Sequence, residues 1–136
     1  MRVVYMAHPV SSPTPEGVVA NLARAKRWYR WIITTFHVAV LADWVLTCEV
    51  LDDAKPSDRR LGMSLNVPLI RRCDEIWLVG GRLSNGMLGE REEAVKNGLV
   101  VQDLTLLLGE EPPGPAQVGT MLEKLRHFAQ LRDAQG

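Results

Sequence analysis

The stretch from residue 73 to residue 90 limits the fold more than any other part of this sequence. A short apolar run at residues 76–79 opens into a glycine-containing turn, and a helix pattern with several acidic residues follows at once. In α/β proteins a ligand site commonly lies at such a point, outside the carboxyl end of a strand and beside the next helix. The stretch therefore predicts one unit of a parallel sheet and the place where a ligand binds.

Three further apolar runs have strand length, at residues 2–7, 37–42 and 99–103. Their continuous apolar character predicts strands that are covered on both faces, as in a parallel sheet. Helix patterns separate the runs, so right-handed βαβ units are expected. We predict a three-layer, Rossmann-like or flavodoxin-like α/β fold with four or five parallel strands in the order 2-1-3-4-5 and helices on both faces. The fourth strand ends at residue 103, or it continues, or a short fifth strand follows it, through Leu108.

Apolar spacing predicts the first connecting helix, which starts near Val18 after a proline-containing loop. Its predicted apolar stripe consists of Val18, Leu22, Ala25, Tyr29, Ile32 and Ile33, and its arginine-rich positions form a solvated face.

Two more helices are predicted from similar evidence. Leu61, Leu65 and Leu69 recur at every fourth position, but Pro68 lacks a backbone donor and predicts a kink or a restart near Asn66. After the glycine turn, residues 87–97 form a helix capped by Ser84 or Asn85 and ended by Gly98.

Length and charge restrict the class of protein. The 136 residues suit one domain, with a core at residues 2–108 and a C-terminal helix at 115–133 whose apolar stripe covers this sheet or a neighbouring subunit. Basic and acidic residues number 16 each, so no net charge attracts nucleic acid or a membrane surface. No apolar run approaches the roughly 18 residues of a membrane span, and no signal-peptide pattern begins the chain. We expect a cytoplasmic protein.

The cysteines and glycines give no sign of a metal or cofactor. Cys48 and Cys73 lie in apolar segments without C-x-x-C spacing, which predicts buried, reduced thiols. No His/Cys/Asp spacing predicts a metal site. Gly80 and Gly81 follow the third strand, and the first strand lacks G-x-G-x-x-G, which argues against a dinucleotide cofactor.

Glu90 is the first candidate catalytic residue. It lies four residues after Gly86, in the first or second turn of a helix whose N-terminus points at the strand edge. The helix dipole favours its ionised form, which suits a nucleophile that attacks an electrophilic carbon. Acidic residues also occur near helix N-termini for stability alone, and Glu92 and Glu93 offer the same chemistry nearby.

Several segments resemble the nucleoside 2-deoxyribosyltransferase superfamily, and in particular its short, poorly characterised branch. Residues 5–9, Tyr-Met-Ala-His-Pro, are similar to the tyrosine-containing first strand and turn of that superfamily. The ladder of Gly86, Glu90, Ala94 and Gly98 at four-residue steps resembles its nucleophile helix. Asn21, Ala25 and Cys73-Asp74 also fit, so the likeness covers about residues 2–104.

The resemblance implies an N-glycosidase or a deoxyribosyltransferase that acts on a nucleoside or a nucleoside 5′-monophosphate. Glu90 would attack the anomeric carbon, and Tyr5 would orient Glu90 or bind near the sugar. The implied partner is a small molecule, not nucleic acid or a membrane, and the family's paired subunits imply a homodimer.

Two departures from the family pattern affect the chemistry. Asn66 and Ser84 stand where related proteins carry aspartates, and an amide cannot supply an acidic proton to the leaving base. Asp43, at the end of the second strand, is an alternative acid. The other open readings are a non-catalytic nucleotide-binding sensor or scaffold, and a phosphoribohydrolase. The candidate substrate-binding residues are His8, Ser11, Asp43, Asn66, Ser84, Asn85 and Gly86.

Overall fold

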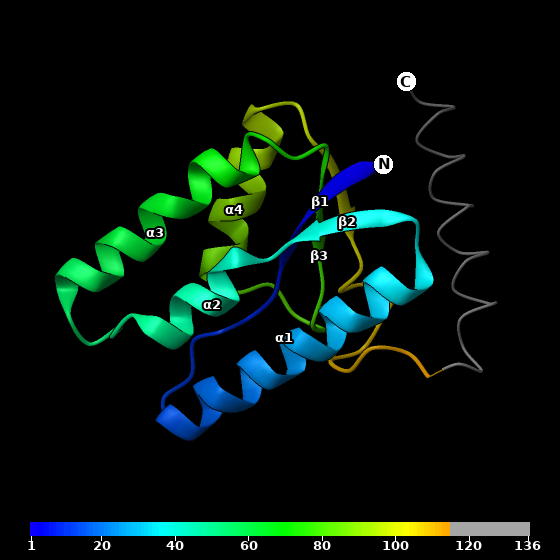
Figure 1. Ribbon diagram of the computed structural model, residues 1–136. Helices are drawn as coiled ribbons and strands as arrows, with labels where there is room; N and C mark the ends of the chain where they lie inside the picture. The colour runs from blue at the N-terminus through cyan, green and yellow to red at the C-terminus, as the bar shows by residue number, and fades with distance from the viewer. Residues whose placement is uncertain (115–136) are drawn as a thin grey trace.

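The computed structural model describes residues 1–114, so the predicted helix at 115–133 lies outside the described residues. Within residues 1–114, four parallel strands form one open sheet in the order β2-β1-β3-β4 (Figure 1). The strands are β1 (Arg2–Ala7), β2 (Val38–Leu41), β3 (Glu75–Leu78) and β4 (Val100–Asp103). This confirms the predicted α/β class and the 2-1-3-4 order.

Of the two predicted strand numbers, four is the correct one for residues 1–114, in which no strand follows β4. Residues 104–108 form a turn instead, in which the amides of Leu107 and Leu108 donate to the carbonyl of Leu104 at 3.2 and 2.9 Å. Leu104 is buried, so its apolar character reflects burial at the end of β4 and not pairing in the sheet.

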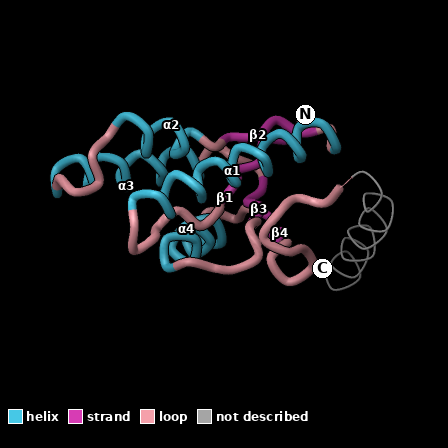
Figure 2. The backbone as a smooth tube through the Cα atoms, turned by 90° about the horizontal axis from the view of Figure 1, so that it is seen from below, coloured by secondary structure: helices cyan, strands magenta, loops and turns pink. Residues whose placement is uncertain are grey.

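Four helices connect the strands of the described chain: α1 (Pro15–Thr35), α2 (Asp43–Val50), α3 (Pro56–Ile70) and α4 (Asn85–Lys96). The helix α1 covers one face of the sheet, and α4 covers the other face with α3 beside it (Figures 1 and 2). Each connection between parallel strands is right-handed. The chain moves along the sheet in one direction from β1 to β2 and in the other direction from β2 to β3 and β4, so the helices of the first connection and those of the later ones lie on opposite faces.

The buried face of α1 differs from the predicted stripe. Tyr29 and Ile33 are exposed, whereas Trp28 and Trp31 are buried. The two indoles belong to a row of edge-to-face aromatic contacts that continues through Phe36 to Trp77 of the sheet. Each of the two indoles buries more apolar area than the side chain of Tyr29 or Ile33 would bury. The two tryptophans therefore determine which face of α1 packs against the sheet.

The helix α3 continues through Pro68 to Ile70, so the predicted restart near Asn66 is wrong. Pro68 lies in the last turn, where it removes one hydrogen bond to the carbonyl of Ser64. Because Ser64 is exposed, water can satisfy this carbonyl, and the helix tolerates the proline.

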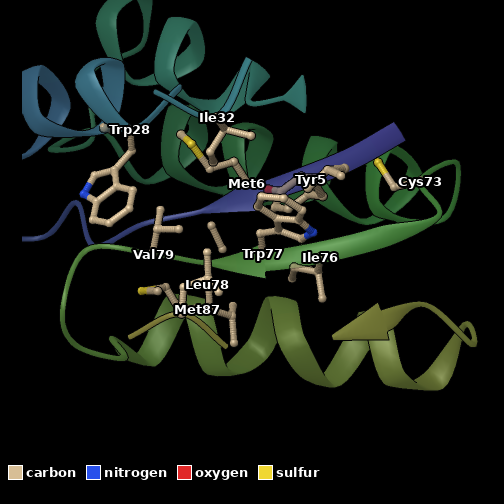
Figure 3. Close-up of a cluster of buried hydrophobic side chains, with 14 of the residues drawn as sticks. Tyr5, Met6, Trp28, Ile32, Cys73, Ile76, Trp77, Leu78, Val79 and Met87 are labelled. Atoms are coloured by element: carbon tan, nitrogen blue, oxygen red, sulfur yellow. The ribbon is translucent and has the colours of Figure 1, made fainter. Parts of the chain in front are cut away.

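The two central strands, β1 and β3, lie inside the core (Figure 3). Their register aligns Tyr5 with Ile76 and Ala7 with Leu78, which brings the segments after both strands to the same edge. At the opposite edge, the carboxylate of Asp74 accepts from the amide of Val3 at 2.7 Å. This contact fixes the register of the strands that carry the candidate site.

The cysteines differ in burial. Cys73 is buried and free, as predicted, but Cys48 is exposed, so the expectation of two buried thiols is wrong for Cys48. Trp44 occupies the inner side of the short helix α2 and is its one buried residue. In the described part of the chain, no helix combines the length and the apolar character that crossing a bilayer requires.

Candidate active site

The turn between β3 and α4 is built on glycines. Gly80 and Gly81 have φ values of +104° and +81°, a region that side chains with a Cβ rarely adopt. Ser84 then caps α4, and its Oγ accepts from the amide of Met87 at 3.2 Å. Ser84, and not Asn85, is therefore the N-terminal cap of α4. Asn85 and Gly86 are the first two residues of α4, and both are exposed.

Glu90 lies on the inner stripe of α4. Met87, three residues before it, and Ala94, four residues after it, are fully buried against the sheet. The neighbouring acidic residues face elsewhere: Glu92 is exposed, and Glu93 accepts from Arg71 at 3.2 Å. Glu90 is thus not an ordinary solvated residue of the early helix.

Tyr5 of β1 meets Glu90 across the layer between sheet and helix. Its side chain is fully buried, and its hydroxyl donates to Oε2 of Glu90 at 2.5 Å. The two residues that the resemblance names as catalytic are therefore in direct contact, although 85 positions separate them in the sequence.

Burial controls the charge of this pair. Loss of hydration raises the pKa of Glu90 to about 7, although the hydrogen bond from Tyr5 opposes the change. Burial, and then the carboxylate of Glu90, raise the pKa of Tyr5 well above its usual value, so the phenol remains a donor. The predicted preference of the helix N-terminus for an ionised carboxylate is outweighed by desolvation. Near neutral pH, Glu90 is close to half ionised.

Cys48 of α2 is a neighbour that sequence reasoning missed. Partial burial of its thiol raises its pKa, and the carboxylates of Asp53 and Glu90 raise it further. Cys48 likewise contributes to the raised pKa of Tyr5. No spacing in the sequence relates Cys48 to Glu90, because the influence of the Glu90 charge on Cys48 depends on how α2 packs.

His8 lies under the glycine turn after β3. It is 3 % exposed, and its Nδ1–H donates to the carbonyl of Pro9 at 2.7 Å. Burial lowers the pKa of His8 to about 4, so the imidazole is neutral. Its Nε2 is buried without a hydrogen-bond partner among the described residues.

Three of the other predicted binding residues lie in exposed or half-buried positions on different segments. Ser11 is exposed in the loop after β1, Asp43 is the exposed first residue of α2, and Asn66 is half-buried in α3. Within residues 1–114, no hydrogen bond joins any of them to Glu90. Trp44, next to Asp43, is buried, and its Nε1 donates to the carbonyl of Met6 at 2.7 Å, which makes it a core residue.

An open hollow lined in part by Arg27, Arg30 and Trp31 lies on the α1 side of the sheet, whereas Glu90 lies on the α4 side. Nowhere in residues 1–114 do three His, Cys, Asp or Glu side chains gather to hold a metal ion.

Fold and site together define an open, parallel, Rossmann-like α/β protein in which a half-buried carboxylate meets a buried phenol between the sheet and one covering helix. The chain belongs to a family described as a domain of unknown function (DUF7768), whose model matches residues 2–104. The match includes every described strand and helix. No curated protein matches the chain.

Proposed function

We propose that this protein is an N-glycosidase or deoxyribosyltransferase that acts on a nucleoside or nucleoside 5′-monophosphate in the cytoplasm. The observation that carries the proposal is the inward-facing carboxylate of Glu90, held at 2.5 Å by the hydroxyl of Tyr5. A partly desolvated carboxylate is a stronger nucleophile than a hydrated one, and the phenol fixes which oxygen remains free.

The reaction has two steps in which Glu90 acts as nucleophile. An oxygen of its carboxylate attacks the anomeric carbon, the C–N bond breaks, and the base leaves with the electron pair and takes up a proton. Water, or the nitrogen of a second base, then displaces the carboxylate and releases the sugar product. Ser84 Oγ is engaged as the helix cap and Asn66 is an amide, so we assign the proton donor to Asp43.

The direct test is release of free base. Purified protein is incubated with a panel of ribo- and deoxyribonucleosides and their 5′-monophosphates, and free bases are separated by chromatography. We expect release by the wild type and by Glu92→Ala, since Glu92 is exposed on the same helix, but not by Glu90→Ala. Release from no compound, or equal release by Glu90→Ala, would refute the proposed reaction.

Tyr5→Phe is expected to move the pH dependence of base release. The Tyr5 hydroxyl stabilises ionised Glu90 and so lowers its pKa. Removing the hydroxyl therefore raises the pKa of Glu90, and a reaction that needs the ionised carboxylate shifts to higher pH. The kcat/KM profile between pH 5 and 9 should show lower activity at pH 7 and partial recovery at pH 9. A uniform loss at every pH would assign Tyr5 a structural role only.

A nucleotide-binding sensor without turnover is the second candidate. It is favoured by Ser84 and Asn66, neither of which can replace an acidic aspartate. Calorimetry with the same panel separates the two candidates, because a sensor binds a nucleotide with measurable heat and releases no base.

A further inference from the structure

The segment that follows β4 returns to α1 and is attached there by polar contacts (Figure 1). The carbonyl of Glu110 accepts from Nε1 of Trp28 at 2.7 Å. A methyl group on Gly81 would lie 2.8 Å from the amide nitrogen of Glu110, so the glycine allows the segment to pass close to the turn after β3. These two contacts fix the backbone at Glu110 and place the next residue, Glu111, beside α1.

Two arginines of α1 hold the carboxylate of Glu111. Arg27 donates from Nε to Oε2 at 2.9 Å and from Nη2 to Oε1 at 2.7 Å, and Arg24 donates from Nε to Oε1 at 3.3 Å. The double contact from Arg27 has the fork geometry in which a guanidinium binds a carboxylate or a phosphate. Glu111 therefore occupies a place on α1 that suits an oxyanion.

A buried amide orients one of the two arginines. Nη1 of Arg24 donates to Oδ1 of Asn21 at 3.4 Å, and Nδ2 of Asn21 donates to the carbonyl of Val10 at 2.9 Å. Asn21 is 9 % exposed, and the side chain of Arg24 is 22 % exposed. Because the Arg24 guanidinium is already positioned, less side-chain entropy is lost when it binds an anion.

The positive charge on this side of α1 exceeds the charge of Glu111. Arg30 follows Arg27 by three residues, as Arg27 follows Arg24, so the three side chains are neighbours along the helix. We call Arg24, Arg27 and Arg30 the arginine row. Within residues 1–114, Glu111 is the one carboxylate that pairs with the row. Arg27 and Arg30 also line the open hollow, together with Trp31, Thr34, Pro112 and Pro113. The row therefore has room and charge for an anion with more than one negative charge.

Glu111 is an occupant that another anion can displace. The side chains of Arg27 and Glu111 are 52 % and 54 % exposed. Ion pairs that are this exposed contribute little stability, because water and dissolved ions compete for both partners. A phosphate group offers three strong acceptor oxygens and up to two negative charges, so it is a stronger partner for the row than a single carboxylate.

We propose that the arginine row binds inorganic phosphate or the phosphate group of a small ester, and that Glu111 competes with this ligand for the same place. The phosphate replaces the carboxylate of Glu111, accepts from Arg24 and Arg27, and has its second charge balanced by Arg30. The segment at residues 110–113 then loses its ionic attachment to α1. The row lies on the α1 side of the sheet and Glu90 on the α4 side, so the proposal is independent of the proposed reaction.

Isothermal titration calorimetry with inorganic phosphate at constant ionic strength tests the competition. Glu111→Gln keeps the length of the side chain but removes its charge. We expect this variant to bind phosphate about tenfold more tightly than the wild type, because the apparent affinity rises with the fraction of molecules in which the row is free. Glu16→Gln, at an exposed acidic position of the same helix, should bind like the wild type. Equal affinity of Glu111→Gln and the wild type would overturn the proposal.

A second pair of variants tests whether the row itself is the site. In the Glu111→Gln protein, adding Arg27→Gln should weaken phosphate binding about tenfold or more. Lys26→Gln is the matched control, since it removes the same charge from the adjacent position, and Lys26 pairs with Glu49 of α2 instead. It should leave the affinity nearly unchanged, and circular dichroism verifies that each variant is folded. Equal weakening by both substitutions would mean that only net charge matters, which contradicts a specific site.

Glycerol 3-phosphate distinguishes the two sources of the phosphate group, because it is an ester without a nucleobase. Tighter binding than inorganic phosphate by Glu111→Gln supports the row as the site of a phosphate ester. Equal or weaker binding supports it as a site for the free ion. If Glu111→Gln binds neither compound at concentrations up to about 10 mM, the arginine row is not a phosphate site and the ion pairs with Glu111 serve only to attach the segment.

Discussion

Glu90→Gln is expected to abolish base release and, at pH 8, to make the folded protein more stable. A carboxamide has nearly the shape of the carboxylic acid and can still accept from the Tyr5 hydroxyl, but it cannot form the glycosyl ester. Loss of a residue that forms the covalent intermediate costs about 10³-fold or more in rate. The stability gain has a separate origin, namely the cost of an ionised carboxylate beside the core.

The direction of the stability effect follows from the two pKa values. Burial raises the pKa of Glu90 from 4.5 to about 7, so between these values the folded chain holds a proton that the unfolded chain has released. Wild-type stability from this group is therefore complete below pH 4.5 and is lost as the pH rises through 7. The difference corresponds to about 3 kcal/mol, which partial exposure of Glu90 reduces to about 2 kcal/mol.

Urea unfolding at pH 4.5 and pH 8 measures this effect. Glu90→Gln should gain about 2 kcal/mol over the wild type at pH 8 and close to nothing at pH 4.5. Glu92→Gln, on the exposed side of α4, should show no such dependence on pH. An equal effect of Glu90→Gln at both pH values would mean that the carboxylate is not desolvated, and the nucleophile argument would lose its physical basis.

Gly80→Ala is expected to destabilise the protein by about 3 kcal/mol or more. The added methyl group would lie 2.7 Å from His8 Cδ2 and 2.8 Å from Pro9 Cδ, and both residues are buried. The backbone φ of +104° adds a conformational cost, because a Cβ disfavours this region. The overlap cannot be relieved by a flexible chain end, so β1 and the turn before α4 must separate.

Gly89→Ala is the matched control for this substitution. A methyl group at Gly89 meets nothing within 4 Å, and its position inside α4 favours alanine by about 0.5–1 kcal/mol. Thermal unfolding of the three proteins should therefore place Gly89→Ala at or above the wild type and Gly80→Ala far below it. If Gly80→Ala unfolds near the wild type, the turn after β3 is not packed against His8 as described.

Most of the sheet was predictable because its signals are local. Four apolar runs identify the four strands to within two residues at each end, and helix patterns between them require parallel pairing. Ser84 and Gly98 mark the ends of α4 by side-chain capping and backbone freedom, which act within one turn. The restart predicted near Asn66 was wrong because the effect of Pro68 depends on solvent access to a single carbonyl, which the sequence does not reveal.

The sequence by itself determined the strands, the order of the sheet and the presence of an acidic residue in the second turn of α4. The tertiary structure alone decided that Glu90, and not Glu92 or Glu93, faces inward, because the rotation of α4 depends on the burial of Met87 and Ala94. It also brought Tyr5 to Glu90 and set the pKa of Glu90 near 7. Desolvation and hydrogen bonding depend on which atoms surround a group in space, and most of those atoms belong to residues far away along the chain.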